Sequence, residues 1–404
     1  MLNVKTPEEV LEIIQKDFWE LPDTEECTLG TALGRTLAED ICAREYVPDF
    51  HRSTVDGYAV KASDTFGCSD SIPAILELRG QVLMGKQAGK KVEAGECIAV
   101  PTGGEIPEGA DAMVMIEYTE DYGDGTIGIL KPAAPGVNMI FRGDDVYPGK
   151  KVLEKGKVLE TADIGVLAAM GISRVSVKRK RRVGIISTGD ELIPAEETPE
   201  VGQIRDVNTS LFMAAVRQAG GEAISFGIIR DEFTLLCEAV EKAAELCDML
   251  LISGGSSVGA KDATCQVIEK KGELLFHGIA MKPGKPTILG RMGQKPIWGL
   301  PGHPAAAMFV LQLYVLPMLD RITVTERIAY PIEAVLEENV GANHGRAQYM
   351  GVYLREEKGK ILARPVRSKS GLICSLAGTA GYFVIDRDCE GLAAGSLIQV
   401  YAFS

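Results

Sequence analysis

Strand-like and helix-like segments alternate along the chain from about residue 183 to residue 320, and this alternation limits the fold more than any other feature. Parallel strands must be joined by crossovers, which are usually helices packed on the sheet, so the alternation predicts a parallel sheet with helices on its faces. The expected strands are Val183–Ser187, Ile224–Ile229, Asp248–Ile252 and Ile297–Leu300, and the expected helices follow Asn208, run from Phe233 to Cys247, lie near Asp262 and run from Pro304 to Leu319. We therefore expect a doubly wound parallel α/β domain.

Two of the expected strands end in polar turns that contain glycine. The first turn is Ser187-Thr188-Gly189-Asp190, and the second begins with Ser253-Gly254-Gly255. Glycine allows backbone N–H groups to approach an anion closely, and phosphate is an anion that such turns bind. Ligands of open α/β sheets lie beyond the carboxyl ends of the strands, so both turns are predicted to line one shared pocket.

Four acidic residues fall at or just after the expected strand ends, namely Asp190, Glu191, Asp231 and Asp262. Carboxylates beside a bound phosphate would repel it, by about 4 kcal/mol for a unit pair ~4 Å apart at an effective dielectric near 20. A divalent cation removes this conflict, and Mg²⁺ suits carboxylate and phosphate oxygens. Taken alone, each acid is better explained as a turn former or a helix cap. Together they predict a magnesium site.

Two lysines lie on a stiff Pro-Gly-Pro scaffold in Lys282-Pro283-Gly284-Lys285-Pro286. The scaffold lowers the entropy cost of directing two ammonium groups at one oxyanion. A following strand ends in Pro301-Gly302-His303, whose backbone N–H groups can serve the same anion. Arg346 and Ser370 lie in polar turns nearer the C-terminus. From the sequence alone, these two are either further oxyanion donors or ordinary turn residues.

The rest of the chain does not show this alternation of strands and helices. Thr6 followed by Pro7 starts a helix, short β-type runs fill residues 42–148, and Thr161–Gly171 forms a capped helix that serves as a connector. Strands and turns from about residue 330 to residue 404 predict a small barrel or sandwich. Polar loops of the β-rich segment carry Asp56, Thr102 and Asp145. Each of these loops, considered alone, is an ordinary turn.

The composition excludes several classes of protein. The net charge of −13 and the pI near 5.0 disfavour a nucleic-acid partner. The basic run of residues 178–182 lacks interleaved aromatic residues, so we interpret it as a solvent-exposed segment that leads into a strand. No apolar run approaches the roughly 18 residues of a membrane span, and the N-terminus has no apolar signal core, so we expect a cytoplasmic protein without a membrane partner. The 9 cysteines are scattered without a Cys-x-x-Cys pair, which argues against a disulfide framework and a zinc site.

A series of motifs, taken in order, resembles the MoeA family, the molybdopterin molybdenumtransferases related to the E domain of gephyrin. The motifs are Ser53-x-x-Asp56-Gly57-Tyr58-Ala59, Pro101-Thr102-Gly103, Gly109-Ala110-Asp111-Ala112, Ser187-Thr188-Gly189-Asp190-Glu191-Leu192, Ser253-Gly254-Gly255, Lys282-Pro283-Gly284-Lys285-Pro286 and Gly299-Leu300-Pro301-Gly302. Each motif is only moderately specific, whereas their joint order is highly specific. The resemblance covers essentially the whole chain.

The resemblance implies a reaction in which adenylylated molybdopterin and molybdate bind, Mg²⁺ assists cleavage of the phosphoanhydride, and AMP leaves as molybdenum joins the dithiolene sulfurs. By the family's pattern, molybdate would be held by Lys282, Lys285, Arg346 and Ser370. The metal and the nucleotide or pterin would be served by Glu191, Asp231 and Asp262, with Asp190 beside them. The substrate-binding turns would contribute Ser187, Thr188, Gly189, Ser253, Gly254, Gly255, Pro301 and Gly302.

The family pattern also implies an elongated homodimer in which the partner's β-rich domain completes the cleft and brings Asp56, Thr102 and Asp145 to it as catalytic residues. The pterin adenylyltransferase is the expected delivery partner. The implied domains are an α/β molybdopterin-binding domain (1–23 and 177–328), a connector (24–41 and 149–176), a β-rich domain (42–148) and a C-terminal β domain (329–404).

The sequence departs from the family pattern at three places: Ser256 stands where Val is usual, His303 where Asn is common, and Thr54-Val55 where Ala-Met is frequent. His303 either contacts a ligand or simply caps the following helix or packs against its neighbours. Two other functions remain open. A pterin adenylyltransferase shares the α/β domain but consumes ATP and does not need the extra β domains. A non-catalytic scaffold is the second, although this chain carries no attached second module or long linker.

Overall fold

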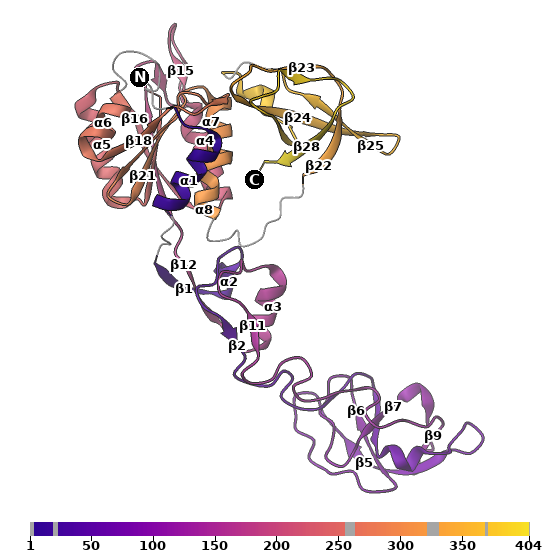
Figure 1. Ribbon diagram of the computed structural model, residues 1–404. Coiled ribbons are helices and arrows are strands. Elements are labelled where there is room, and N and C mark those ends of the chain that lie inside the picture. The colour runs from indigo at the N-terminus through magenta and orange to yellow at the C-terminus, as the bar shows by residue number, and fades with distance from the viewer. Residues whose placement is uncertain (1–3, 19–22, 255–262, 321–330, 368–370, 404) are drawn as a thin grey trace. The chain divides into compact units, whose positions relative to one another are not determined.

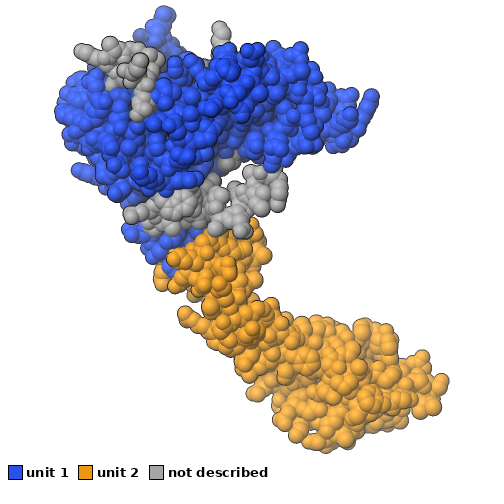
Figure 2. Space-filling model, viewed as in Figure 1, with its two compact units in different colours: residues 1–25, 34–36, 176–404 blue, residues 26–33, 37–175 orange. Residues whose placement is uncertain are grey.

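The computed structural model describes residues 4–18, 23–254, 263–320, 331–367 and 371–403. The chain divides into two compact units: residues 1–25, 34–36 and 176–404, and residues 26–33 and 37–175 (Figure 2). Two strands, β1 (Thr24–Thr28) and β12 (Arg174–Lys178), contain residues of both units.

A six-stranded sheet with the order β16-β13-β17-β21-β20-β18 forms the centre of the first unit (Figure 1). β16, β13, β17 and β21 are parallel to their neighbours, as the sequence predicted. At one edge, β20 pairs antiparallel with β21, and β18 pairs antiparallel with β20. The sequence did not predict these two edge strands, β18 and β20. The bounds are β13 Arg182–Thr188, β16 Glu222–Ile229, β17 Met249–Ser253, β18 Glu273–His277, β20 Ile288–Met292 and β21 Lys295–Leu300. The sheet is therefore mixed, with a parallel part that carries the predicted turns.

Successive residues of the central strands pack on opposite faces of this sheet. Ile185 and Leu251 belong to one buried cluster, whereas Ile186 and Ile252 belong to another. The helices on the first face are α1 (Pro7–Asp17), α4 (Val207–Gln218), α7 (Pro304–Val310) and α8 (Leu316–Asp320), and those on the second are α5 (Phe233–Leu246) and α6 (Ala263–Lys271) (Figure 1). Both faces are covered, which confirms the doubly wound architecture.

The N-terminal helix begins where the sequence predicted. The Thr6 side chain accepts the Glu9 backbone N–H at 3.2 Å, and the Glu9 carboxylate accepts the Thr6 N–H at 2.8 Å, which completes a capping box. Val10 and Ile14 of this helix are buried in the core of the first unit. The predicted helix of residues 304–319 is interrupted by a π-helical turn, Leu311–Val315, because Pro317 cannot donate a backbone hydrogen bond to the preceding turn.

The C-terminal part of the first unit is a closed barrel rather than a sandwich. Its strand order is β24-β25-β22-β28-β26, and β26 pairs with β24 to close it. The bounds are β22 Ile332–Leu336, β24 Ala347–Glu357, β25 Lys360–Pro365, β26 Gly381–Ile385 and β28 Leu397–Ala402, with a small side sheet of β23 Val340–Gly341 and β27 Gly391–Leu392. A short strand of the α/β part, β19 (Met281–Lys282), pairs in parallel with β24. This pairing joins the Lys282 segment to the barrel.

The second unit is built on a separate six-stranded sheet with the order β7-β4-β6-β5-β9-β8. Its strands are β4 Gly57–Val60, β5 Ala74–Gln81, β6 Glu96–Val100, β7 Ala112–Met115, β8 Thr119–Asp121 and β9 Thr126–Ile129. Two smaller pairs and two helices complete the unit: β2 Ile41–Cys42 with β11 Lys151–Leu153, β3 Arg52–Ser53 with β10 Met139–Ile140, α2 Leu29–Ala32 and α3 Thr161–Ala169.

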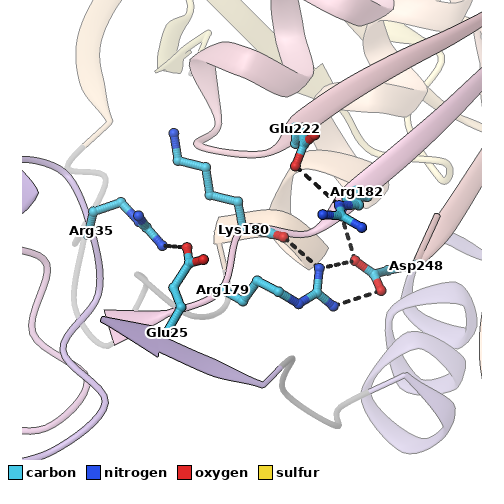
Figure 3. A network of polar contacts seen from close by, with 7 residues as sticks. All are labelled: Glu25, Arg35, Arg179, Lys180, Arg182, Glu222 and Asp248. Atoms are coloured by element: carbon cyan, nitrogen blue, oxygen red, sulfur yellow. Dashed lines mark hydrogen bonds and ion pairs between the residues drawn. The ribbon is translucent and has the colours of Figure 1, made fainter. Parts of the chain in front are cut away.

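The basic run before β13 is tied into an ion-pair network and is less solvated than the sequence predicted (Figure 3). Arg179 binds the Asp248 carboxylate with both terminal nitrogens, at 3.0 and 2.9 Å, and the Arg182 backbone N–H donates to the same carboxylate at 2.8 Å. Arg182 also pairs with Glu222, and Arg181 is 8% exposed. The run therefore anchors the start of β13 to the start of β17.

Replacing Asp248 with Asn should lower the free energy of unfolding at pH 7 by roughly 1.5–3 kcal/mol, the value of a charge-assisted hydrogen bond. Burial raises the pKa of Asp248, but the hydrogen bonds from Arg179 and from the Arg182 backbone outweigh burial, so the pKa lies below its usual value. Because the folded pKa is depressed, the carboxylate stabilises the fold above its unfolded pKa, and that stability is lost as the pH falls through the folded pKa.

Urea unfolding of both proteins from pH 7 down to about pH 3.5 checks this, and the two curves should converge as the carboxylate becomes protonated. The control is Glu222→Gln, which removes an exposed pair and should cost less than about 1 kcal/mol. A difference for Asp248→Asn that stays constant across this pH range would contradict the prediction.

No helix in the described part of the chain is both long and apolar enough to cross a membrane. All 9 cysteines lie in the described residues and none forms a disulfide; those at positions 27, 68, 97, 237, 247 and 265 are buried. Burial raises the pKa of the Cys97 thiol to about 12, as expected for an inert core residue.

Candidate functional site

The sheet order brings the polar turns of the first unit to one edge. β16, β13, β17 and β21 are neighbours and parallel, so the turns after their last residues all lie at the carboxyl edge. These turns carry Asp231, Glu191, Gly254 and Gly302 respectively. The sequence predicted this gathering, because consecutive strand ends in a parallel sheet share one edge.

We call the first cavity at this edge the glycine cavity. Its volume is ≈ 690 Å³, and the turns after β13, β17 and β21 line it. Its lining residues are Thr188, Glu191, Leu192, Pro199, Gln203, Ile204, Arg205, Asp206, Val207, Asn208, Ser253, Gly254, Gly302, His303, Pro304 and Gly371. Five of the predicted site residues, Thr188, Glu191, Ser253, Gly254 and Gly302, therefore share one cavity.

The glycine at position 254 is required by close contact between two turns. Gly254 has φ +99°, and a Cβ atom there would lie 2.1 Å from the Thr188 backbone oxygen. Gly189 also has a positive φ, of +155°, and its missing side chain leaves room for the Glu191 carboxylate, which lies 2.8 Å from the Cβ position. Any other residue at 254 would push the two turns apart.

Asn208, which the sequence marked only as the start of a helix, holds two of these turns together. The residue is 5% exposed, and its side-chain nitrogen donates to the Ser253 hydroxyl at 2.6 Å and to the Gly302 backbone oxygen at 2.9 Å. It lies in α4, whose N-cap Asp206 accepts the Thr209 N–H at 3.1 Å. No sequence motif pointed to this role, because it depends on contacts 45 and 94 residues away.

The acidic residues at this edge are held by local hydrogen bonds. The Thr188 hydroxyl donates to the Asp231 carboxylate at 2.8 Å, and the Asp231 backbone N–H donates to the Asp190 carboxylate at 3.3 Å. Neither Asp190 nor Asp231 lines the glycine cavity, whereas Glu191 does. Within the described ranges, no group of three His, Cys, Asp or Glu side chains could hold a metal ion.

Three of the predicted site residues, Asp262, Gly255 and Ser370, lie outside the described residues, as does Ser256. A fourth, Ser187, is fully buried, and its hydroxyl forms a hydrogen bond with the Thr209 hydroxyl at 2.9 Å. Ser187 therefore fixes the end of β13 and does not line either cavity.

We call the second cavity of the first unit the lysine cavity; its volume is ≈ 790 Å³. It is lined by Met281, Lys282, Pro283, Gly284, Lys285, Pro286, Pro301, His303, Ala305, Ala306, Phe309, Arg346, Gln348, Tyr349, Met350, Gly351, Val366, Arg367, Ser375 and Leu376. The pairing of β19 with β24 places Lys282 opposite Gln348, two residues beyond Arg346. Lys282, Lys285 and Arg346 thus meet although they come from different parts of the sequence.

The lysine cavity has a strongly positive lining. Among its described lining residues there is no Asp or Glu, and Lys282, Lys285 and Arg346 form no ion pair with any described residue. Arg367 lies there as well and pairs with Glu338 at 3.1 Å. Burial, assisted by the nearby Glu8 charge, raises the pKa of Tyr349 to about 12, so this residue stays neutral at pH 7. Such a lining suits a small, doubly charged anion.

His303 borders both cavities. Its backbone forms the N-cap of α7, but its side chain makes no capping hydrogen bond, so the capping alternative is wrong for the side chain. The two glycine turns share one cavity, as predicted, whereas the lysine segment, which was expected at the same site, lines a second cavity that shares His303 with the first.

Three predicted residues, Asp56, Thr102 and Asp145, lie in the second unit. The Asp56 carboxylate accepts the Thr102 backbone N–H at 2.8 Å, so these two residues lie side by side. Asp145 lies in the loop between β10 and β11, where its backbone N–H donates to the Val47 oxygen at 3.1 Å.

Comparison with known proteins shows the family to which the chain belongs. Three family models match the chain: "MoeA N-terminal region (domain I and II)" over residues 5–171, "Probable molybdopterin binding domain" over residues 184–321, and "MoeA C-terminal region (domain IV)" over residues 333–403. The molybdopterin molybdenumtransferase of Bacillus subtilis is 33% identical over 99% of this chain and 95% of its own length. The chain belongs to the MoeA family.

Other MoeA relatives extend this result. The molybdopterin molybdenumtransferase of Haemophilus influenzae is 31% identical over 94% of both chains. A crystal structure of the molybdopterin biosynthesis MoeA protein of Pyrococcus horikoshii has a TM-score of 0.87 and 37% identity and covers 99% of both chains. The family expected from the ordered motifs is therefore confirmed.

Proposed function

We propose that this chain is a molybdopterin molybdenumtransferase, which transfers molybdenum from molybdate to adenylylated molybdopterin and releases AMP. The observation that carries this proposal is the lysine cavity, in which Lys282, Lys285 and Arg346 gather without an acidic neighbour among the described lining residues. The glycine cavity shares His303 with it. One cavity suits a compact dianion and the other a phosphorylated ligand.

In this proposal the lysine cavity holds molybdate, a substrate. Ammonium and guanidinium groups donate hydrogen bonds to its oxygens, and Ser370 would add a hydroxyl donor. The glycine cavity holds the nucleotide end of the adenylylated pterin beside the turns at Gly254 and Gly302. Binding both ligands beside His303 would orient them for a reaction between them.

The chemistry of the acidic residues at the sheet edge would suit a magnesium ion. Glu191 and Asp231 offer hard carboxylate oxygens, and Thr188 orients the Asp231 carboxylate at 2.8 Å. Mg²⁺ commonly takes one or two carboxylates together with substrate phosphates and water, so Glu191, Asp231 and Asp262 would suffice to hold it. When bound, the ion would supply charge neutralisation for the anhydride and its leaving phosphate. Glu191 would fix the position of the ion.

The proposal includes a cytoplasmic homodimer in which Asp56, Thr102 and Asp145 of the partner subunit act on the substrate. The pterin adenylyltransferase would deliver the adenylylated pterin. These parts rest on the family pattern, and a mixture of two inactive variants offers a direct check of them, because subunits with defects in different units would restore one intact cleft.

Mixing the purified protein with adenylylated molybdopterin and molybdate tests the function. AMP should be released only when both substrates are present, and without added ATP. A requirement for ATP would indicate an adenylyltransferase instead, and the absence of any AMP release would leave a scaffold role as the better explanation.

Replacing Glu191 with Gln should slow AMP release by about 100-fold, because a neutral amide holds Mg²⁺ much less well than a carboxylate. AMP release at increasing Mg²⁺ concentrations measures the effect, and the variant should need more Mg²⁺ for half-maximal rate. The control is Glu196→Gln, a change to a nearby exposed acid that lines neither cavity. Full turnover by Glu191→Gln at the Mg²⁺ concentration that serves the unchanged protein would contradict the metal assignment.

A further inference from the structure

Arg205 lines the glycine cavity from a pair of short parallel strands. These are β14 (Leu192–Ile193) and β15 (Ile204–Arg205), in which Ile193 is opposite Arg205. The backbone N–H of Ile204 donates to the Glu191 oxygen at 2.8 Å, and that of Asp206 donates to the Ile193 oxygen at 2.9 Å. The backbone on both sides of Arg205 is therefore fixed to the segment that follows Glu191.

The guanidinium group of Arg205 is oriented by one hydrogen bond and forms no ion pair among the described residues. Its Nε–H donates to the Glu197 backbone oxygen at 2.9 Å. This bond leaves the N–H groups of Nη1 and Nη2 for a ligand, and a guanidinium presents these donors in a planar fork that matches two phosphate oxygens. An arginine with one nitrogen fixed loses less side-chain entropy when it binds.

The charges around the glycine cavity indicate that Arg205 is needed if the cavity is to bind an anion. Its described lining residues include two acids, Glu191 and Asp206, and Arg205 is the one Lys or Arg among them. Asp206 is 7% exposed and its carboxylate caps α4, and it forms no ion pair with Arg205 among the described residues. A phosphate in this cavity would meet the Glu191 charge, and Arg205 is the lining residue that offsets it.

We propose that Arg205 binds the phosphate of the nucleotide in the glycine cavity through the terminal nitrogens of its guanidinium group. This inference rests on the proposed function and adds to it a phosphate ligand for AMP and for the adenylyl group of the substrate. Molybdate does not depend on Arg205, because the lysine cavity has its own cations.

Calorimetric titration of the full chain with AMP, with adenosine and with molybdate tests the proposal. The variants are Arg205→Ala and Arg205→Lys, and the control is Arg217→Ala, which removes an equal charge from the last turn of α4 outside both cavities. Arg205→Ala should bind AMP roughly 10- to 100-fold more weakly, whereas its binding of adenosine and molybdate should be unchanged. Arg205→Lys should keep part of the AMP affinity, and Arg217→Ala should keep all of it.

The comparison between AMP and adenosine separates the possible outcomes. If Arg205→Ala binds AMP as the unchanged protein does, Arg205 is not a phosphate ligand, and the proposed function stands because AMP still binds. Equal loss of AMP and adenosine binding would also overturn the proposal, since Arg205 would then act on the nucleoside or on the fold. Failure of the unchanged protein to bind AMP would overturn both this inference and the proposed nucleotide site.

Discussion

The chain in which Lys282 and Lys285 are both replaced by alanine should bind molybdate roughly 10²- to 10⁴-fold more weakly than the unchanged chain. Both side chains line a cavity that has no acidic residue among its described lining. Each charge-assisted hydrogen bond contributes about 1.5–3 kcal/mol, so losing two corresponds to roughly 3–6 kcal/mol of binding free energy. Equilibrium dialysis with molybdate measures the loss, and AMP release should fall with it.

A control with the same change in net charge distinguishes local contacts from the general field of the protein. Lys16 and Lys242 are exposed lysines of the same unit, and neither lines the lysine cavity. The Lys16→Ala/Lys242→Ala chain should bind molybdate almost as well as the unchanged chain, because exposed charges at a distance are screened by salt. Similar losses in the two double variants would show that the cavity lysines do not contact the anion.

The parallel part of the fold could be predicted because each of its elements has a local signal. Ile185 and Ile186 both lie in one apolar run, and such a run followed by a polar glycine turn indicates a buried strand. Strand ends of this kind meet at one edge of a parallel sheet, so the gathering of Thr188, Ser253 and Gly302 followed from the sequence. Lys282 and Lys285 could be predicted as a pair because the Pro-Gly-Pro scaffold lies between and beside them.

Other features depend on contacts that a local pattern does not encode. β18 and β20 were missed because their short apolar runs resemble core segments of any kind, and their antiparallel pairing is set by the neighbouring strands. The sequence did not distinguish a barrel from a sandwich in the C-terminal part, since closure of the barrel depends on the pairing of β24 with β26. Asn208 and Arg205 were missed as site residues because Asn208 acts through distant turns and Arg205 lies in a strand of only two residues.

Replacing Gly254 with alanine should destabilise the first unit by roughly 2–4 kcal/mol and greatly weaken AMP binding. The φ of +99° is strained for a residue with a side chain, and the new Cβ would lie 2.1 Å from the Thr188 backbone oxygen. Strained backbone costs about 1–3 kcal/mol, and the clash must also move the turn after β13 or the turn after β17. Moving either turn would reshape the glycine cavity, in which AMP is proposed to bind.

Gly302→Ala is the matched control, because both glycines line the same cavity but only position 302 has room for a Cβ atom. A Cβ at position 302 would have the Gly254 Cα as its nearest neighbour, at 3.9 Å, which is ordinary contact. Urea unfolding and AMP titration of the two variants should therefore differ, with Gly302→Ala close to the unchanged chain in both measurements. If Gly254→Ala matched the unchanged chain in stability and in AMP affinity, the close approach of the turns after β13 and β17 would not be required. The proposal that this backbone geometry lets the glycine cavity bind phosphate would then fail.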